Sequence, residues 1–591
     1  MKKYILFPLL FISVSNAWSQ TPSWLWAENA LPIYSGIGSG GIATDPQGNV
    51  YVTGYFADLT ITFGDSVLYN ANTNINQLSN DIFIVKYDPS GNVLWARRDG
   101  GVNDELATGM ALDAAGNIYV TGYFYSDATS GLDTAIFGAT ILVNDSSDQL
   151  NDMFLVKYDN NGHELWARGA GGDGNDGGSG LACDQLGNIY VIGSSTSDSI
   201  AFGTFELDTA VMFLVKYDST GNVIWARRGG GDMGSQGYDQ VSSVVADKSN
   251  NVYIAGGFLS DSISFGPFTL YNANAGNQTA PFLLKCDTGG AALWAKAGVS
   301  YPPQFVIDYD QVFSIVTDAS GNVFTAGAFG SDSVRFANSS LVNPHTSYGK
   351  ADAFLLKWDA NGNVLWADNV QSTSADGDVP YSIATDNTGS VYMGGYFDES
   401  DTLQFGTSVS VSSLCSSSLG SIDMFFAKYD GSGNALWAQQ ASGKSCPGVD
   451  ICNSIATDLN GNVYSIGTFT GDTLDLGTTT LMNQPDSITS FFIAKLGSTI
   501  NGIQKVKASA AGISIYPNPA KDAFTIVLNN DIQNGRLEVC DMLGHNIFTE
   551  EFNNYYSGNN KYVQMSVPAG VYLARVTDGL SQYTAKVVIT P

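Results

Sequence analysis

Histidine, positive charge and long apolar runs are all scarce in this chain. Its 591 residues include only three histidines, and 26 Lys plus Arg stand against 56 Asp plus Glu, for a formal net charge of −30 at pH 7. No His-Glu-x-x-His pattern or nucleophile elbow is present, which argues against the enzyme classes that use them. The negative charge disfavours binding to nucleic acid or to anionic lipid. Beyond the N-terminus, no stretch is long and apolar enough to predict a transmembrane helix.

The six cysteines have no metal-ligand spacing, so we do not expect a zinc site. Cys446 and Cys452 flank one loop and are the leading candidates for a disulfide. A bond from Cys415 to either of them is the alternative pairing. The other three cysteines lie in strand-like sequence, and we expect them to be small core residues: Cys183, Cys286 and Cys540.

Residues 1–19 have the composition of a signal peptide. Lys2 and Lys3 precede an apolar run over 4–14, and Ala17-Trp18-Ser19 fits a small-x-small cleavage site. The apolar run is too short to span a bilayer. We therefore expect export, with a mature chain beginning at Gln20.

A long repeat dominates the following 480 or so residues. The sequence Leu-Trp-Ala or a close variant recurs at intervals of 59 to 72 residues, with its tryptophan at positions 26, 95, 166, 225, 294, 366 and 437. Two further motifs, Gly-Asn-Val-Tyr-Val-Thr-Gly and Phe-x-Val-Lys-Tyr-Asp, also recur seven times. Self-similarity at a long, nearly fixed period predicts a repeat architecture.

Each repeat is predicted to hold four main strands. In the sixth repeat these are residues 382–386, 391–397, 424–430 and 435–438, in which β-branched and aromatic residues alternate with small or polar ones. Asp-x-x-Gly-Asn joins the first strand to the second and the third to the fourth, which is tight-turn chemistry. A Phe-Gly pair between the second and third strands predicts one short extra strand.

Seven repeats of four antiparallel strands predict an all-β fold, a seven-bladed β-propeller spanning residues 20–498. The seventh repeat has no Leu-Trp-Ala after it, and the first Leu-Trp-Ala has no third strand before it. We therefore expect residues 23–27 to supply the fourth strand of the last blade and to close the ring. The repeat text resembles the bacterial SBBP-type β-propeller repeat family, a resemblance that implies the fold and little about activity.

A different sequence begins after a Gly/Ser/Asn-rich linker at 499–512. Residues 513–591 contain short alternating segments that predict a small β-sandwich, immunoglobulin-like in kind. The segment resembles the type A C-terminal sorting domain of the type IX secretion system. The matching positions are Tyr516, Pro517, Asn518, Pro519, Asp541, Gly544, Gly570, Tyr572 and Lys586. The resemblance implies recognition by the type IX machinery, passage across the outer membrane of a Gram-negative bacterium, and removal of the domain.

A set of acidic residues stands eight positions before the aspartate that ends each first strand. Six of the seven repeats have one: Glu105, Asp176, Asp239, Asp310, Asp378 and Asp450. Because the first strand of a propeller blade lines the central channel, we expect these side chains at the channel mouth. They would either form a ring that binds Ca²⁺ or a cationic ligand, or cap loops by accepting hydrogen bonds from backbone amides.

Three functional hypotheses follow. The leading one is a non-catalytic binding or adhesion module for a glycan or a protein, located in the medium or at the cell surface. The second is a glycan hydrolase or lyase that uses acidic residues at the channel mouth. The third is a structural surface-layer protein, which would associate with itself.

Overall fold

The computed structural model of the chain is built of β-strands. Every regular element is a strand in the residues that it describes, which are 21–30, 37–74, 78–125, 134–144, 150–208, 212–231, 239–276, 278–301, 310–343, 351–372, 377–398, 402–413, 421–443, 448–483, 489–497, 513–528, 532–541, 546–555, 560–565, 567–577 and 582–590. The predicted all-β class is therefore confirmed. No helix long and apolar enough to cross a membrane occurs in these ranges.

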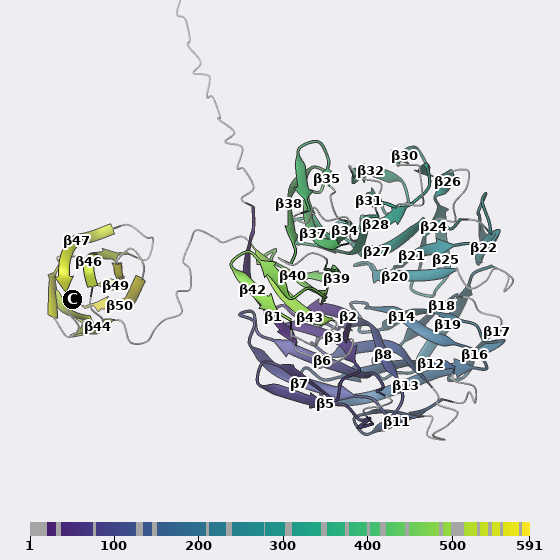
Figure 1. The fold of residues 1–591 in the computed structure, drawn as a ribbon, viewed down its shortest axis with the longest axis horizontal. Helices are drawn as coiled ribbons and strands as arrows, with labels where there is room; N and C mark the ends of the chain where they lie inside the picture. The colour runs from purple at the N-terminus through teal and green to yellow at the C-terminus, as the bar shows by residue number, and fades with distance from the viewer. Residues whose placement is uncertain are drawn as a thin grey trace, which may run out of the picture. The chain divides into compact units, whose positions relative to one another are not determined.

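The chain divides into two compact units, residues 1–498 and 499–591 (Figure 1). Residues 1–20, which hold the predicted signal peptide, and the linker at 499–512 lie outside the described residues.

The first compact unit contains seven four-stranded antiparallel groups within its described residues, which we call units 1 to 7. Unit 1 consists of β2 (Ile37–Thr44), β3 (Val50–Phe56), β6 (Asp81–Tyr87) and β7 (Val93–Asp99). Unit 2 consists of β8 (Glu105–Leu112), β9 (Ile118–Tyr125), β12 (Asn151–Tyr158) and β13 (Glu164–Gly172). Unit 3 consists of β14 (Asp176–Cys183), β15 (Ile189–Ser195), β18 (Met212–Tyr217) and β19 (Val223–Gly229).

Units 4 to 7 follow the same order. They consist of β20 (Gln240–Ala246), β21 (Val252–Phe258), β24 (Ala280–Cys286) and β25 (Ala292–Ala297); β27 (Gln311–Thr317), β28 (Val323–Phe329), β31 (Asp352–Trp358) and β32 (Val364–Asn369); β33 (Val379–Thr385), β34 (Val391–Asp398), β37 (Ile422–Tyr429) and β38 (Ala435–Ala441); and β39 (Asp450–Thr457), β40 (Val463–Phe469), β43 (Ser490–Gly497) and β1 (Ser23–Ala30).

The first strands of the units contact one another in cyclic order. β2, β8, β14, β20, β27, β33 and β39 follow in sequence, and β39 in turn contacts β2. Unit 7 takes its fourth strand from the other end of the chain, since β1 pairs antiparallel with β43 and places Trp26 opposite Lys495. In Figure 1 the purple strand β1 lies beside the yellow-green strand β43.

The segment between the second and third strands differs from the prediction. Where one short strand was expected, each unit has a two-stranded hairpin. In units 1 to 4 the hairpins are β4 (Thr60–Phe63) with β5 (Ser66–Tyr69), β10 (Thr134–Phe137) with β11 (Thr140–Val143), β16 (Ser199–Phe202) with β17 (Phe205–Asp208), and β22 (Ser262–Phe265) with β23 (Phe268–Tyr271). In units 5 to 7 they are β29 (Ser333–Phe336) with β30 (Ser339–Val342), β35 (Thr402–Phe405) with β36 (Val409–Ser412), and β41 (Thr473–Leu476) with β42 (Thr479–Met482). A short strand β26 (Val299–Tyr301) joins the hairpin of unit 5. The motif Phe-Gly is the turn itself, because its glycine adopts a positive φ, as at Gly64 with φ +53°.

The hydrophobic core lies between adjacent units. Phe83 of unit 1, for example, packs against Phe491 of unit 7, with ring centroids 5.5 Å apart. The third strands are buried along their whole length in most units, which explains why their sequence is apolar almost without alternation.

The second compact unit has two antiparallel sheets that share one core. The first sheet has the order β44 (Ile513–Tyr516), β45 (Ala523–Leu528) and β48 (Asn560–Gln564), and the second β47 (Asn546–Tyr555), β46 (Ile532–Cys540), β49 (Gly570–Thr577) and β50 (Gln582–Ile589). Phe524 and Ile526 of one sheet pack with Leu537 and Val587 of the other. This is a small two-sheet sandwich.

Candidate functional site

The six predicted acidic residues lie at or just before the starts of the first strands, and all are buried. Asp310 accepts hydrogen bonds from the backbone amides of Gly330 and Ser331, at 3.0 and 3.2 Å. In unit 4, Asp239 accepts bonds from the amides of Leu259 and Ser260, at 2.8 and 3.0 Å. In each case the carboxylate holds the turn that follows the second strand of its own unit.

Asp176 has the same role in its unit, whereas Asp450 and Glu105 accept bonds from residues that follow the fourth strand of the preceding unit. Ser197 donates a 2.8 Å hydrogen bond to Asp176, and Gly443 donates one of the same length to Asp450. The amide of Gly101 donates a 2.8 Å bond to Glu105. Asp378 is buried as well, with an exposed fraction of 0%.

Burial raises the pKa of most of these groups. It raises the pKa of Asp176 and Asp310 to about 6 and that of Asp450 to about 7, against the hydrogen bonds that lower it. Burial also raises the pKa of Asp81, which contacts Arg98 at 3.3 Å, to about 7, and that of the nearby Glu105 well above its ordinary value. We call Asp81, Asp176, Asp310 and Asp450 the buried aspartate set.

The structure does not bring the six predicted residues together. Each lies within its own unit, and no group of three or more metal-ligating side chains occurs in the part of the chain that the structure describes. The geometry therefore matches the loop-capping interpretation.

The aspartates that end the first strands take part in a second, repeated arrangement. In unit 5, Asp318 accepts bonds from the amides of Ser320 and Asn322, both at 2.9 Å, and lies 3.2 Å from the ammonium of Lys357. These bonds keep the pKa of Asp318 below its ordinary value despite burial. Lys357 also lies 4.7 Å from the centre of the Phe324 ring.

In six of the seven units this lysine also bonds the third-to-fourth-strand turn of the next unit. Lys357 and Trp366 of unit 5 donate to the same acceptor, the backbone carbonyl of Gly431 in unit 6, at 3.0 and 3.2 Å. The indole also lies over Gly433, where a side chain would collide with it. The three recurring sequence motifs thus supply the parts of one inter-unit joint, which supports a packing role for the tryptophans.

The joint between units 6 and 7 lacks one part. The strands β43 and β1 are not consecutive in the chain, so no third-to-fourth-strand turn connects them. Lys428 bonds Asp386 and Tyr392 and its side chain is 20% exposed, against 9% for Lys357. A polar pocket of about 230 Å³ lies there, beside Trp437.

Trp24 and Trp358 lie outside the Leu-Trp-Ala repeat pattern. Trp358 is 2% exposed and its indole donates a 3.0 Å bond to Thr325. Trp24 packs edge-on against Phe426 at 5.2 Å. Trp358 is a core residue, and Trp24 is partly buried and packs against the core.

The predicted disulfide is not formed at Cys452. This residue has a free thiol with 0% exposure, and it packs in the core formed by units 6 and 7 instead of facing the loop. Cys446 and Cys415 lie outside the described residues. Cys286 and Cys540 are buried core residues, as predicted.

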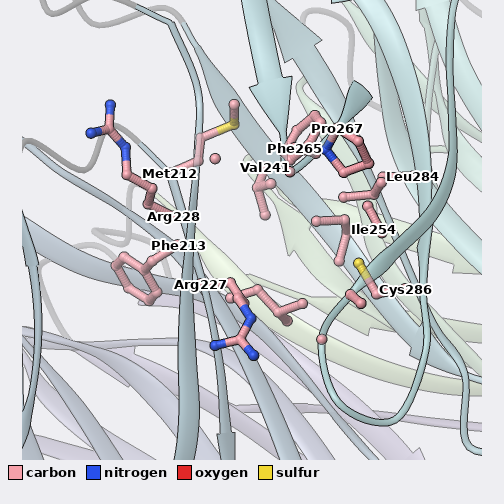
Figure 2. Close-up of a pocket in the computed structure, with 16 residues that line it drawn as sticks. Met212, Phe213, Arg227, Arg228, Val241, Ile254, Phe265, Pro267, Leu284 and Cys286 are labelled. Carbon is pink, nitrogen blue, oxygen red and sulfur yellow. The ribbon is translucent and has the colours of Figure 1, made fainter. Parts of the chain in front are cut away.

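Two further cavities lie in the first compact unit. One, of about 330 Å³, is lined by the Asp-x-x-Gly-Asn turns, on the face opposite to the predicted acidic ring. The other, of about 310 Å³, lies between units 3 and 4 and is mostly apolar (Figure 2). Sequence reasoning did not predict this second cavity. The available signal was Cys286, which stands at a position where most repeats have a tyrosine.

The sorting-motif residues of the second compact unit have local structural roles. Asn518 bridges the N-terminal segment to the last strand, because its amide donates to the carbonyl of Lys586 at 2.7 Å and accepts from the amide of Val588 at 2.8 Å. Pro517 and Pro519 have no N–H, so the side chain of Asn518 supplies the pairing that the backbone cannot. Tyr572 donates a 2.7 Å bond to the carbonyl of Pro568.

The other predicted positions are more dispersed. Tyr516 ends β44 and is half exposed, Gly570 begins β49, and Lys586 is exposed on β50. Asp541 follows β46, and Gly544 lies outside the described residues.

Two family patterns match the chain. Residues 165–201 match a family described as a beta-propeller repeat, and residues 514–590 match the secretion system C-terminal sorting domain. The chain carries a β-propeller repeat and a type IX sorting domain. Both predicted resemblances are confirmed, and the sorting domain indicates that this propeller-repeat protein is exported, to the cell surface or the medium.

Relatives of the propeller-repeat protein are distant. An uncharacterised WD repeat-containing protein of Acanthamoeba polyphaga mimivirus is 25% identical over 72% of this chain and 35% of its own. The regulatory protein FlaEY of Caulobacter vibrioides is 27% identical over 29% of this chain and 19% of its own length. An endo-acting ulvan lyase of Formosa agariphila is 36% identical over 81 residues, 14% of this chain and 15% of its own.

The chain thus spans about a third or less of the length of these curated relatives. Among solved structures, Sqt1 from Chaetomium thermophilum aligns over 74% of this chain and 97% of its own, with 9% identity and a TM-score of 0.35, too low to carry an argument.

Proposed function

We propose that the propeller-repeat protein is a non-catalytic binding module, for a glycan or a protein, that works at the outer surface of a Gram-negative bacterium or in its medium. The fold we propose is a seven-bladed β-propeller closed by β1, followed by an immunoglobulin-like sorting domain. The signal peptide at 1–19 and the sorting domain at 513–591 would both be removed during export.

The use of the acidic residues carries this proposal. An acidic hydrolase or lyase needs carboxylates that reach the substrate. Here Glu105, Asp239 and Asp310 are buried and accept hydrogen bonds from backbone amides of the turns and connections beside them. Their observed contacts stabilise loops, which favours a binding module over an enzyme.

The hairpins between the second and third strands offer the binding surface. The second strands of these hairpins present large apolar side chains to solvent, including Tyr69, Val143, Tyr271 and Met482, which are 61–75% exposed. Loops and hairpins that protrude from a rigid scaffold are common ligand sites, and tyrosine is favoured at interfaces with proteins and sugars.

The similarity to the ulvan lyase does not change this proposal. It extends over 81 residues, 14% of this chain, and so it does not span the ring of units. Lyase activity is a property of that protein.

A binding screen tests the proposal. The exported chain should be presented to arrays of bacterial and algal glycans and to surface proteins, with and without calcium. We expect retention of at least one ligand without turnover, reduced by a Tyr69→Ser, Tyr271→Ser double variant and unchanged by Asp239→Asn with Asp310→Asn in a folded sample. Turnover of a polysaccharide that the aspartate double variant abolishes would establish the enzyme instead, and self-association without any ligand would establish the surface-layer hypothesis.

Calcium is tested in the same samples. If a ring of carboxylates binds Ca²⁺, millimolar calcium raises the melting temperature through preferential binding to the folded state. An unchanged melting temperature argues against the cation interpretation.

A further inference from the structure

The cavity between units 3 and 4 arises from one departure from the repeat. At the end of the third strand, most units have a large aromatic residue, such as Tyr158, Trp358 or Tyr429, which is at most 2% exposed. Unit 4 has Cys286 there. The residue paired with it across the sheet is Ala292, so both members of the pair are small.

No other unit has this combination. In unit 6 the pair is Tyr429 with Ala435, and in unit 7 it is Leu496 with Trp24, so one member is always large. Because both side chains in unit 4 are small, the space that an aromatic ring fills elsewhere is left as a cavity of about 310 Å³.

The cavity has an apolar floor and an open rim. Leu214, Ile254 and Leu284 line its buried interior together with Cys286, while Arg227 and Pro267 are exposed at its edge (Figure 2). Burial raises the pKa of the Cys286 thiol to about 12, so this wall is uncharged. The volume is close to that of small-molecule sites, and the apolar walls favour an apolar group in the occupant.

The equivalent spaces in other units indicate what fits. Tyr158 of unit 2 fills its space with a ring and donates a 2.7 Å hydrogen bond to Asp99 on the fourth strand of unit 1. Tyr429 of unit 6 does the same, at 2.8 Å, with Asp368 of unit 5. In both cases an aromatic ring carries an oxygen that meets a charged group of the preceding unit.

The unit 3 to unit 4 interface has no carboxylate at either of these positions. The positions corresponding to Asp368 and Asp99 are Arg227 and Gly229. Arg227 stacks on Trp225 at 5.2 Å and donates to the carbonyls of Ala226 and Gly289, but no carboxylate among the described residues pairs with it. An occupant of this space therefore lies beside the guanidinium of Arg227, with no carboxylate at the positions of Asp99 and Asp368.

We propose that this cavity binds a small aromatic carboxylate, with the ring in the place of the missing tyrosine side chain and the carboxylate toward Arg227. This site is separate from the hairpin surface proposed above and does not depend on it. Charge-assisted bonds from a guanidinium to a carboxylate supply orientation, and the apolar walls supply affinity.

Calorimetric titration of the full exported chain tests the proposal with 4-hydroxybenzoate and 4-hydroxycinnamate. Benzyl alcohol and hexanoate serve as the neutral aromatic and the aliphatic acid. We expect binding of one aromatic carboxylate per chain with a Kd on the order of 0.1–1 mM, the range that ligands of this size reach. Cys286→Tyr should abolish binding by filling the cavity, and Arg227→Gln, at an exposed position, should weaken it about tenfold.

Tyr429→Cys is the matched control, because it recreates the pair of small residues next to Asp368. It should open a cavity that prefers the neutral benzyl alcohol to either carboxylate. The proposal is overturned if neither aromatic carboxylate binds at 10 mM, if Cys286→Tyr binds as the wild type does, or if hexanoate or benzyl alcohol binds the wild type at least as tightly.

Discussion

Tyr429 allows the packing between units to be tested with a graded series. Its ring is fully buried, lies parallel to Trp366 of the preceding unit at 6.4 Å, and donates a 2.8 Å hydrogen bond to Asp368. Burial raises the pKa of Asp368, and the tyrosine hydroxyl counteracts it. Removal of the hydroxyl alone should therefore leave a buried carboxylate with one fewer donor.

The expected magnitudes differ between two substitutions. Tyr429→Phe loses a hydrogen bond to a charged group, which should lower the free energy of unfolding by about 1.5–3 kcal/mol. Tyr429→Cys also removes the buried ring next to Ala435, which adds a cavity term typical of large-to-small core changes, for a total of about 5 kcal/mol.

Tyr217→Phe is the control in the same chain. Tyr217 occupies the equivalent place in unit 3 and is 2% exposed, but no hydrogen-bond partner for its hydroxyl occurs among the described residues. Tyr217→Phe should therefore change the free energy of unfolding by less than about 0.5 kcal/mol.

Urea-induced unfolding, followed by tryptophan fluorescence and by far-UV circular dichroism, measures these differences where the two probes coincide. The reasoning is refuted if Tyr429→Phe and Tyr217→Phe cost the same, or if Tyr429→Cys costs less than about 2 kcal/mol.

Four further outcomes are expected. Lys357→Met should lower the free energy of unfolding by about 3 kcal/mol, because it leaves Asp318 buried without its cation. A double-mutant cycle with Asp318→Asn measures the pair, and a coupling energy of less than about 1 kcal/mol would contradict this cause. Trp294→Phe should lower the free energy of unfolding by about 1 kcal/mol, because it loses the 3.2 Å bond from the indole to a backbone carbonyl of the next unit. Trp437→Phe should not, because no third-to-fourth-strand turn of unit 7 faces Trp437. Equal urea midpoints for the two variants would argue against a stabilising role of this inter-unit bond. Because their pKa values are raised, the carboxyl groups of the buried aspartate set bind more protons in the folded chain than in the unfolded chain between about pH 4 and pH 7. Their contribution to the free energy of unfolding is therefore lost as pH rises through that window, and the melting temperature should be higher at pH 5 than at pH 8. A flat profile would show that these groups do not control the melting temperature. Asn518→Ala should destabilise the second compact unit by about 2 kcal/mol through the loss of two hydrogen bonds. Calorimetry follows the unfolding transition of this unit, and an unchanged transition would refute the bridging role.

Local chemistry made the strands and turns predictable from sequence. The strands of unit 6 were expected at 382–386, 391–397, 424–430 and 435–438, and they occur at Val379–Thr385, Val391–Asp398, Ile422–Tyr429 and Ala435–Ala441. The turn residues determine these positions, because an Asx turn followed by glycine at positive φ ends one strand and begins the next.

The acidic residues show where such reasoning stops. Their spacing is regular, and regular spacing is consistent with a shared ring as well as with one loop cap in each unit. The choice depends on which groups face the carboxylates. Asp310 faces two amides and a serine of its own unit, a contact between residues about twenty positions apart that no local pattern specifies.

Cys452 shows the same dependence on tertiary contacts. Cys446 and Cys452 are close in sequence, but alternation along β39 turns the side chain of Cys452 into the core. Closeness along the chain does not determine which face of a strand a residue occupies once a bulge shifts the register, as it does between Cys452 and Ser454.

The sequence by itself determined the all-β class, the repeat of four strands and the sorting domain at the C-terminus, because turn chemistry and strand alternation act over a few residues and are repeated many times. The tertiary structure alone decided which side chains meet across neighbouring units. Those contacts join residues some 60 to 75 positions apart, as when Lys357 and Trp366 both bond Gly431 of the next unit or Tyr429 bonds Asp368 of the preceding one. For the same reason only the folded chain reveals that the small pair Cys286 and Ala292 leaves a cavity beside Arg227 of the preceding unit.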